Sequence, residues 1–219
     1  MEKIAVIGAT GKMGKLICET LKNSYEIIEI DKTKDINIAR DCDLIIDFST
    51  GSNSSKTAKW CEIYRKKLII GATGQTNEEN KLIKSASKNI PILMAGNFSI
   101  GISTLKNIFF NLKNLPIENI IIYECHHKNK KDAPSGTAKE LKTFLKSLFN
   151  CKIDTIFSRG GEEIGLHQIS FYFGSEALKF SHQAFSRKSF IDGLIKTIPY
   201  MLKLNNPGLI SFDNIIKSL

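Results

Sequence analysis

The chain has 219 residues, 42% of them hydrophobic, which is enough to bury one large core or two smaller ones. Its apolar runs have strand length, so we expect no membrane span, and the amino terminus lacks the apolar stretch of a secretory signal. The five cysteines include no CxxC pair, which argues against a disulfide framework or a zinc site. We therefore expect a cytoplasmic protein without a metal ion.

The net charge of +9 allows two kinds of partner, a nucleic acid or a small anion. Only four of the 31 basic residues are Arg, the residue best suited to reading bases and phosphates, and the lysines are scattered. We therefore expect no nucleic acid partner and favour a small anionic substrate.

The first 98 residues alternate between short aliphatic runs and amphipathic segments, as in a parallel α/β domain. Strands are expected at 3–8, 26–31, 43–49, 67–74 and 91–97. Helices are expected at 12–23, 52–67 and 77–89. Only about eleven residues separate Asp31 from the third strand, so we expect a short or irregular connection there instead of a full crossover helix.

The second half has a different pattern, with strands gathered together after a helix. Strands are expected at 118–127, 152–158, 166–174 and 177–185, and helices at 99–115, 135–149 and 189–204. This order predicts an α+β region with an open sheet. The last helix is expected to pack back on the first domain, and Pro199 is expected to kink or split it.

A glycine turn follows the first strand, with Gly8, Gly11 and Gly14 at three-residue spacing before a helix. Such a turn lets the backbone approach a pyrophosphate and aims helix N-terminal amides at it. Asp31 lies 23 residues after Gly8, where an acid is expected to bind ribose hydroxyls. Lys32 could meet a 2′-phosphate, so the choice between NADH and NADPH stays open. The glycines could instead serve only helix–strand packing.

Two further small-residue turns, at 71–74 and 95–101, lie at the carboxyl ends of the fourth and fifth strands. Cofactors lie at the carboxyl ends of strands in open α/β sheets, and small residues there let a flat ring approach the backbone. Ordinary strand-to-helix turns would have the same composition.

The segment "YECHHKNKKDAPSGT" combines adjacent histidines, lysines and a helix start. His126 and His127 point to opposite sides of a strand, so they cannot share one role or one metal ion. One of them could act as a proton donor at neutral pH. Lys130 offers a mobile ammonium group, and 135–137 supply amides and hydroxyls at a helix N-terminus, which suit a carboxylate.

The sequence here resembles the 4-hydroxy-tetrahydrodipicolinate reductase (dihydrodipicolinate reductase) family of lysine biosynthesis. The family signature E-x-H-H-x-x-K-x-D-x-P-S-G-T is matched by residues 124–137. In order along the chain, "GATGKMG" (8–14), "GATG" (71–74), "AGNFSIG" (95–101) and "SHQAFSRKSFIDG" (181–193) are similar to its other motifs. The resemblance thus spans nearly the whole chain.

The resemblance implies a Rossmann-like dinucleotide-binding domain made of residues 1–98 and 187–219. Residues 99–186 would form an α+β substrate-binding and oligomerisation domain with an open mixed sheet. The implied activity is the reduction of 4-hydroxy-tetrahydrodipicolinate to tetrahydrodipicolinate by NADH or NADPH, in the diaminopimelate pathway. The implied partners are a small dicarboxylate substrate and three further copies of the chain in a homotetramer.

The resemblance also implies roles for particular residues. His126 would be the proton donor and Lys130 the other catalytic group. His127, Gly136 and Thr137 would hold a substrate carboxylate. The residues implied to line the cofactor are Gly8, Ala9, Thr10, Gly11, Lys12, Met13, Asp31, Gly71, Ala72, Thr73, Ala95, Gly96, Asn97 and Phe98.

The chain departs from the family pattern in length, with less sequence than many members between the second and third strands and around "RGGEEIGLHQ". Two other functions are compatible with part of the sequence pattern. A related imine or semialdehyde oxidoreductase would share the nucleotide half but not the 126–137 segment. A non-catalytic basic protein would bind DNA in a salt-sensitive way and would not oxidise NAD(P)H.

Overall fold

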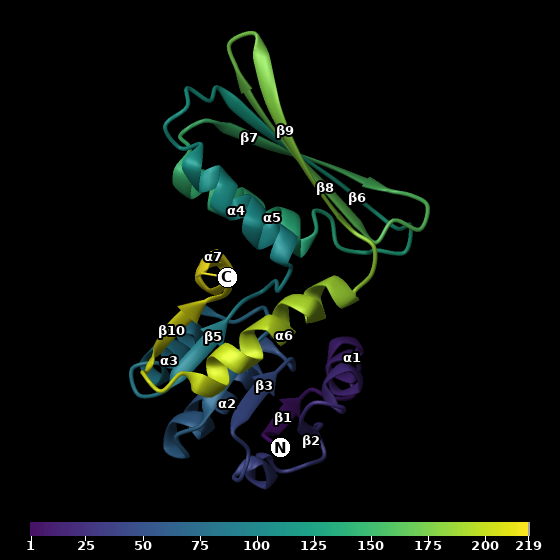
Figure 1. The fold of residues 1–219 in the computed structure, drawn as a ribbon. Helices are drawn as coiled ribbons and strands as arrows, with labels where there is room; N and C mark the ends of the chain where they lie inside the picture. The colour runs from purple at the N-terminus through teal and green to yellow at the C-terminus, as the bar shows by residue number, and fades with distance from the viewer. Residues whose placement is uncertain (219) are drawn as a thin grey trace. The chain divides into compact units, whose positions relative to one another are not determined.

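The computed structural model describes residues 1–218, which form two units (Figure 1). The first unit consists of residues 1–98 and 191–218, and the second of residues 99–190. The second boundary lies four residues beyond the one expected after residue 186. Among the described residues, no helix combines the length and apolarity needed to cross a bilayer.

The first unit is built on a six-stranded sheet in which every strand pairing is parallel. Its strands are β1 (Lys3–Ile7), β2 (Glu26–Ile30), β3 (Leu44–Asp47), β4 (Lys67–Ile70), β5 (Pro91–Met94) and β10 (Gly208–Ser211). Their order is β10-β5-β4-β3-β1-β2, so the chain moves in one direction from β1 to β2 and in the other from β3 onward. The point of reversal lies between β1 and β3, where open α/β sheets bind their ligands.

Helices cover both faces of this sheet, which explains why its strands are apolar at nearly every position. The helices are α1 (Lys12–Leu21), α2 (Gly51–Ile63), α3 (Asn77–Ala86), residues 191–203 of α6 (Lys188–Lys203) and α7 (Phe212–Ser218). One core cluster joins alternate strand residues to α2 and α3, including Ala5, Ile45, Leu68, Ala58 and Ile83. The strand residues between them point to the opposite face, where α1 and α6 lie (Figure 1).

The connection from β2 to β3 contains only the short 3-10 helix η1 (Ile36–Ala39), as the spacing predicts. Asp35 caps this helix by accepting the backbone N–H of Asn37 at 2.9 Å. The chain therefore passes from β2 to β3 without a full crossover helix.

The carboxyl-terminal part of the first unit differs from expectation in two ways. β10 and α7 are not predicted from the sequence, because a four-residue strand with alternating exposure has little periodic signal of its own. β10 forms by pairing with β5, more than a hundred residues away in sequence. Of the two outcomes expected at Pro199, a kink or a split, the split is wrong, because α6 continues to Lys203, and the kink stays a prediction.

The second unit has a four-stranded mixed sheet with α4 (Ile100–Asn111) and α5 (Gly136–Leu148) on one face (Figure 1). Its strands are β6 (Asn119–His126), β7 (Lys152–Arg159), β8 (Gly165–Phe173) and β9 (Glu176–Ala184). In the order β7-β6-β8-β9, the β6–β7 pair is parallel and the others are antiparallel. Together the two units confirm the predicted α/β fold with an open mixed second sheet.

Burial alternates strictly along β6, so that every second side chain lies under the helices. Ile120 and Ile122 belong to the apolar core of this unit, together with Phe109, Leu141 and Phe171. The next two buried positions on the same face are Glu124 and His126, which are polar. The apolar core therefore ends in a buried group of titratable side chains.

Candidate functional site

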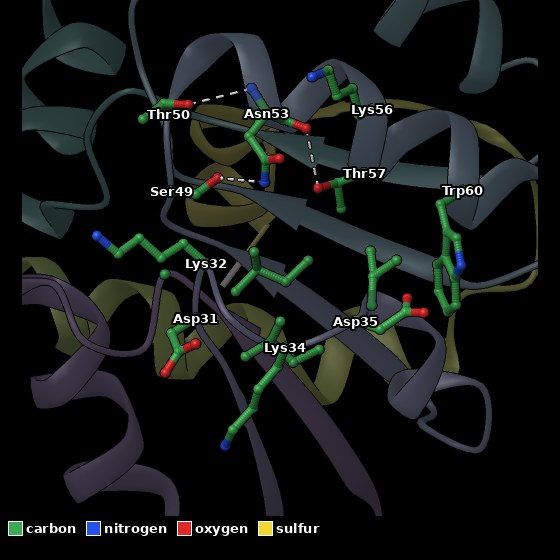
Figure 2. A pocket seen from close by; sticks show the side chains of 14 residues that line it. Asp31, Lys32, Lys34, Asp35, Ser49, Thr50, Asn53, Lys56, Thr57 and Trp60 are labelled. Atoms are coloured by element: carbon green, nitrogen blue, oxygen red, sulfur yellow. Dashed lines mark hydrogen bonds between the residues drawn. The ribbon is translucent and has the colours of Figure 1, made fainter.

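A hollow of about 680 Å³ lies at the carboxyl ends of the strands in the first unit (Figure 2). Gly8, Asp31 and Lys32, three of the residues expected to line a cofactor, contribute to its wall. They follow β1 and β2, and Ser49 and Thr50 follow β3 on the other side of the hollow. The hollow thus occupies the reversal point of the sheet.

The glycines of the β1–α1 turn are required by packing. Gly8 has a φ of +82°, and a Cβ there would lie 2.7 Å from the carbonyl oxygen of Phe48. A Cβ at Gly14 would lie 2.1 Å from the carbonyl oxygen of Gly8, so α1 can pack this close to the turn only with glycine. The first amides of α1 have no carbonyl within the helix, so they are available to an anion. The packing role and the binding role are therefore compatible.

Asp31 stands at the end of β2, where its carboxylate organises the next turn. It accepts the backbone N–H of Thr33 at 2.8 Å and the Thr33 hydroxyl at 2.6 Å. These hydrogen bonds hold the pKa of Asp31 below its usual range, so the group is ionised at neutral pH. An ionised carboxylate at this position can accept hydrogen bonds from ribose hydroxyls.

Sequence reasoning missed the part of the hollow that α2 supplies. Figure 2 shows Asn53, Thr57 and Trp60 along this helix, across the hollow from the turn that carries Asp31, and Lys56 also lines the hollow. Lys32 and Lys34 line the hollow as well, and Nζ of Lys34 donates to the carbonyl of Glu29 at 3.0 Å. The sequence could have indicated these residues, because a helix begins directly after the third strand of a parallel sheet, at the edge where ligands bind.

Of the other residues expected to line the cofactor, Ala9–Met13 lie in the β1–α1 turn and at the start of α1, and those at 71–73 and 95–98 follow β4 and β5 at the same edge of the sheet. The two turns are neighbours, because a Cβ at Gly96 would lie 3.4 Å from Cγ2 of Thr73. Gly71 accommodates the Phe48 ring, which a Cβ would approach to 2.2 Å. Phe98 is buried, with ring centroids 5.9 Å from Phe48 and 5.2 Å from Phe212. Any contact of Phe98 with a cofactor would therefore use its backbone.

The candidate site of the second unit is centred on Glu124, whose side chain is fully buried. Its Oε1 accepts Nη2 of Arg159 at 2.7 Å and the backbone N–H of Ser135 at 3.0 Å. Burial alone would raise the pKa of Glu124, but these hydrogen bonds outweigh it and hold the pKa below its usual range. Glu124 is therefore a buried carboxylate that stays ionised.

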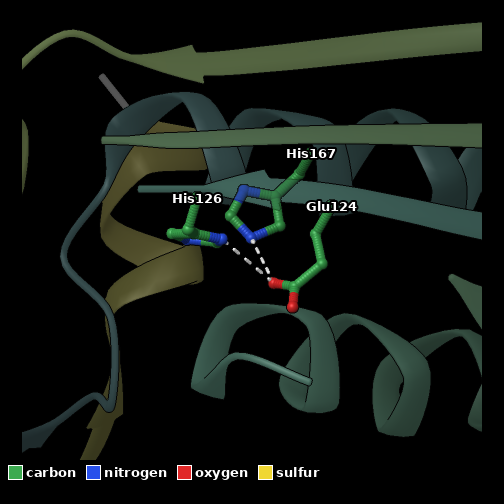
Figure 3. Close-up of side chains that lie close together, drawn as sticks. All are labelled: Glu124, His126 and His167. Carbon is green, nitrogen blue, oxygen red and sulfur yellow. Dashed lines mark ion pairs between the residues drawn. The ribbon is translucent and has the colours of Figure 1, made fainter. Parts of the chain in front are cut away.

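The other oxygen of Glu124 faces two imidazole rings (Figure 3). Oε2 lies 3.4 Å from Nδ1 of His126 and 3.7 Å from Nε2 of His167. The two rings meet edge to face with centroids 5.2 Å apart. Burial lowers the pKa of both, to about 4 for His167, where the neighbouring His126 adds to the effect. Both rings are therefore mainly neutral at pH 7 in the free protein.

The loop after β6 carries the remaining residues expected at a substrate site. β6 ends at His126, so His127 lies in the loop, where its N–H is bonded to the carbonyl of Glu163. Lys130 pairs with Asp132, with Nζ 2.7 Å from Oδ1. This hydrogen bond lowers the pKa of Asp132. The same loop is anchored at Asp132, whose carbonyl accepts Nη2 of Arg159 at 2.7 Å.

The expected helix N-terminus is also present. Ser135 caps α5 by accepting the N–H of Ala138 at 3.1 Å, and Gly136 and Thr137 form the first turn. A Cβ at Gly136 would meet no atom within 4 Å, so this turn is open on that side. The geometry suits a carboxylate bound at the helix N-terminus.

Sequence reasoning assigned no role to Glu124, Arg159, His167 or His182. Strand register explains why they meet: Glu124 pairs with His167, and His167 with His182, across three strands. Oγ of Ser99 lies 3.1 Å from Nε2 of His182. The sequence does contain one signal for these residues, which is that polar residues occupy strand positions where the alternation predicts buried apolar ones. That signal can be interpreted only once the pairing of the strands is known.

Glu124, His126 and His167 also offer three donor atoms within 4.8 Å of one another, a spacing that a metal ion could use. The guanidinium of Arg159, bonded to the same carboxylate, opposes a second cation at this place. The cluster is therefore better suited to holding protons.

Models of known families match most of the chain. Residues 27–98 match the model described as dihydrodipicolinate reductase, N-terminus, and residues 100–216 match the model described as its C-terminus. The chain belongs to the dihydrodipicolinate reductase family. The family and reductase class predicted from the motifs are thereby confirmed, as is the family's use of NADH or NADPH.

Curated relatives named 4-hydroxy-tetrahydrodipicolinate reductase cover nearly the full chain. The one from Wigglesworthia glossinidia brevipalpis is 36% identical over 251 residues, covering 98% of this chain and 92% of the relative. The one from Thermosipho africanus is 36% identical over 219 residues, covering 98% of both. The shorter loops of this chain are therefore shared with at least one named reductase.

A solved structure confirms the fold. A dipicolinate-bound dihydrodipicolinate reductase from Paenisporosarcina sp. TG-14 superposes with a TM-score of 0.81 at 21% identity, covering 98% of this chain and 99% of that one. A myo-inositol 2-dehydrogenase from Lactobacillus plantarum gives a TM-score of 0.64 at 11% identity, covering 99% and 94%. The architecture is thus common to several dehydrogenases, while the sequence identifies the family.

Proposed function

We propose that the chain reduces 4-hydroxy-tetrahydrodipicolinate to tetrahydrodipicolinate with NADH or NADPH, in the diaminopimelate route to lysine. The observation that carries the proposal is the buried imidazole of His126 beside a loop with an ammonium group and an open helix N-terminus. The match to the family over both halves of the chain supports the same reaction. The dipicolinate bound to the Paenisporosarcina relative is a small planar dicarboxylate, which supports a substrate of this class.

The first unit is proposed to hold the nucleotide. The hollow at the reversal point fits such a group, because it combines a tight glycine turn, helix N-terminal amides and an ionised Asp31. Lys32 is proposed to meet a 2′-phosphate when NADPH is bound. The nicotinamide of either cofactor supplies the hydride.

His126 is proposed to supply the proton. Hydride addition to a conjugated imine leaves negative charge on the substrate, and a nearby imidazolium can neutralise it. Burial lowers the pKa of His126 in the free protein, while Glu124 acts in the opposite direction. A bound dicarboxylate would raise the pKa further, so substrate binding would itself bring a proton onto the ring.

The loop and α5 are proposed to hold the substrate carboxylates. Lys130 is proposed as the second catalytic group, exchanging Asp132 for a substrate carboxylate. His127, Gly136 and Thr137 are proposed to hold a carboxylate at the start of α5. A carboxylate at this end of the helix is also favoured by the helix dipole.

The enzyme is proposed to be a cytoplasmic homotetramer. The five cysteines are free thiols, which persist in a reducing compartment. None of the described helices covers the second face of the β7-β6-β8-β9 sheet, where Ile121, Tyr123 and Ile156 share one side. Light scattering should give the mass of four chains, and a monomer would contradict the tetramer.

The test of the reaction is a coupled assay. Fresh product of dihydrodipicolinate synthase is added to the folded protein with NADH or NADPH, and the loss of reduced nicotinamide absorbance is followed. We expect turnover with at least one of the two nucleotides, with tetrahydrodipicolinate as product. A folded sample without turnover on either would refute the proposal.

A further inference from the structure

Two buried atoms at the end of β6 have no hydrogen-bond partner among the described residues: Oε2 of Glu124 and Nδ1 of His126. Glu124 and His126 are 0% and 7% exposed, so solvent is not at hand to satisfy them. A buried polar atom without a partner is destabilising, because it has lost its hydrogen bonds to water and gained none in the protein. The two atoms lie 3.4 Å apart, so a small decrease in this distance would form a hydrogen bond between them. In that bond Nδ1 is the donor and the carboxylate is the acceptor.

The second ring near Oε2 has an alternative partner. Nε2 of His167 lies 3.3 Å from Oγ of Ser135, closer than its 3.7 Å from Glu124. Ser135 already accepts the N–H of Ala138, so its own proton is free for Nε2 of His167. His167 can thus accept at Nε2 and leave Oε2 of Glu124 to His126.

We propose that Glu124 is a positioning residue that holds a proton on Nδ1 of His126, so that Nε2 is the atom that receives and transfers the catalytic proton. This inference rests on the proposed function, because it assumes that His126 is the donor. The ring would gain a second proton at Nε2 when the dicarboxylate binds, pass it to the reduced substrate, and return to the neutral form with Nδ1–H unchanged.

The surroundings support this orientation. Gly165 lies beside the ring, and a Cβ there would come within 3.1 Å of Nε2, so glycine leaves room at the edge that must reach the substrate. Oε1 of Glu124 is held by Arg159 and Ser135, which fixes the direction in which Oε2 points. One carboxylate therefore anchors the substrate loop with one oxygen and orients the imidazole with the other.

Several charged or titratable groups act on His126, and together they determine how its protonation depends on pH. They are Glu124 on the same strand, Arg159 on β7, His167 on β8, and Lys130 and Asp132 in the loop. Glu124 acts most strongly in favour of the imidazolium, while Arg159 and Lys130 disfavour it. Removing the charge of Glu124 should therefore lower the pKa of His126.

The test is Glu124→Gln. The glutamine oxygen can accept from Arg159 and Ser135 as Oε1 does, which places the amide NH₂ against Nδ1 and forces the other tautomer. We expect kcat to fall about 100-fold or more. The alkaline limb of the kcat profile should move to lower pH, a shift that a merely structural role would not produce. NADH affinity should be unchanged.

The matched control is Glu118→Gln. Glu118 lies just before the start of β6 and also accepts a backbone N–H, that of Gly174 at 3.1 Å, but it lies far along the strand from the histidines. Its variant should keep the wild-type kcat and pH profile. An equal loss of kcat in both variants would overturn the proposal.

A second measurement needs no turnover. Nitrogen NMR of the imidazoles in the wild type at pH 8, with His126 assigned by its absence in His126→Gln, should show the neutral Nδ1–H form. The Nε2–H form, or a Glu124→Gln enzyme with the wild-type pH profile, would overturn the proposal. If Glu124→Gln does not fold, or if the wild type shows no turnover, the tautomer of His126 measured by NMR alone tests the proposed role of Glu124. A failure of the proposed reaction is therefore a separate result from a failure of this inference.

Discussion

The two units place their functional groups in opposite environments. In the first, Asp31 and Lys32 stand at the mouth of an open hollow, and the glycine turn contributes backbone amides. In the second, Glu124, His126 and His167 are 0%, 7% and 4% exposed. One site is made of backbone and solvated charge, and the other of titratable side chains removed from water.

This difference separates binding from chemistry. Solvated charges are screened, and the lowered pKa of Asp31 keeps its carboxylate ionised at neutral pH, which suits holding a nucleotide. Burial shifts protonation equilibria, and here it lowers the pKa of both His126 and His167. Substitutions in the two units should therefore change different kinetic parameters.

The largest effect is expected for His126→Gln, which removes the proposed proton donor. We expect kcat to fall by about 10²- to 10⁴-fold, the usual contribution of general acid catalysis. Lys130→Ala should also lower kcat strongly. Both variants should bind NADH as the wild type does, as measured by fluorescence titration. His127→Gln is the matched control, because it alters the neighbouring ring and should raise KM more than it lowers kcat.

A variant of His126 or Lys130 with wild-type turnover would remove that residue from its proposed role. Weaker NADH binding in either variant would contradict the separation of the two sites.

The next effect concerns stability and His167. Burial, with the neighbouring His126 charge, lowers the pKa of His167 to about 4 from 6.5. Between these values the unfolded chain binds a proton that the folded chain does not, so stability falls as the pH is lowered. At about 1.36 kcal/mol for each pKa unit, the loss amounts to roughly 3 kcal/mol for this group.

Urea unfolding at several pH values between 7.5 and 4.5 measures this effect. His167→Gln should show a shallower fall in the free energy of unfolding over that range, although its stability at pH 7.5 will be lower. An unchanged slope would mean that His167 is already accessible to protons in the folded state. His126 and His182 have lowered pKa values and contribute in the same direction.

The two sites also differ in how well the sequence predicts them. The glycine turn and Asp31 lie within one strand–turn–helix–strand unit, so local spacing identifies them. The segment 124–137 likewise names His126 and Lys130 through the family resemblance. The partners of Glu124 come from β7 and β8, and the register that aligns them is a product of long-range pairing. The same reason explains why β10, an edge strand completed by β5, is not predicted.

The first unit offers the third prediction, Asp31→Ala. A charged hydrogen bond of this kind is worth about 1.5–3 kcal/mol, so NADH should bind about 10- to 100-fold more weakly. NADPH should be affected less, because its 2′-phosphate is repelled by the same carboxylate. Lys32→Ala is the matched control on the adjacent residue and should weaken NADPH more than NADH. Equal losses for both nucleotides in Asp31→Ala would exclude Asp31 as the ribose ligand, and kcat with saturating cofactor should not change in either variant.

The smallest effect is expected at the Lys130–Asp132 pair, which is exposed to solvent like the charges of the first unit. The two side chains are 21% and 52% exposed, so the pair should contribute less than about 1 kcal/mol, and less at high salt. In Asp132→Asn the backbone carbonyl still accepts from Arg159, so the loop should keep its anchor. The substitution removes the ion pair that Lys130 must break before it can bind a substrate carboxylate. The KM for the dicarboxylate should therefore fall, while kcat changes little. If KM rises instead, Asp132 holds Lys130 in the position that the substrate needs. The pair would then act as a fixed part of the site, like the buried side chains around Glu124, and not as a solvated charge like those of the nucleotide site.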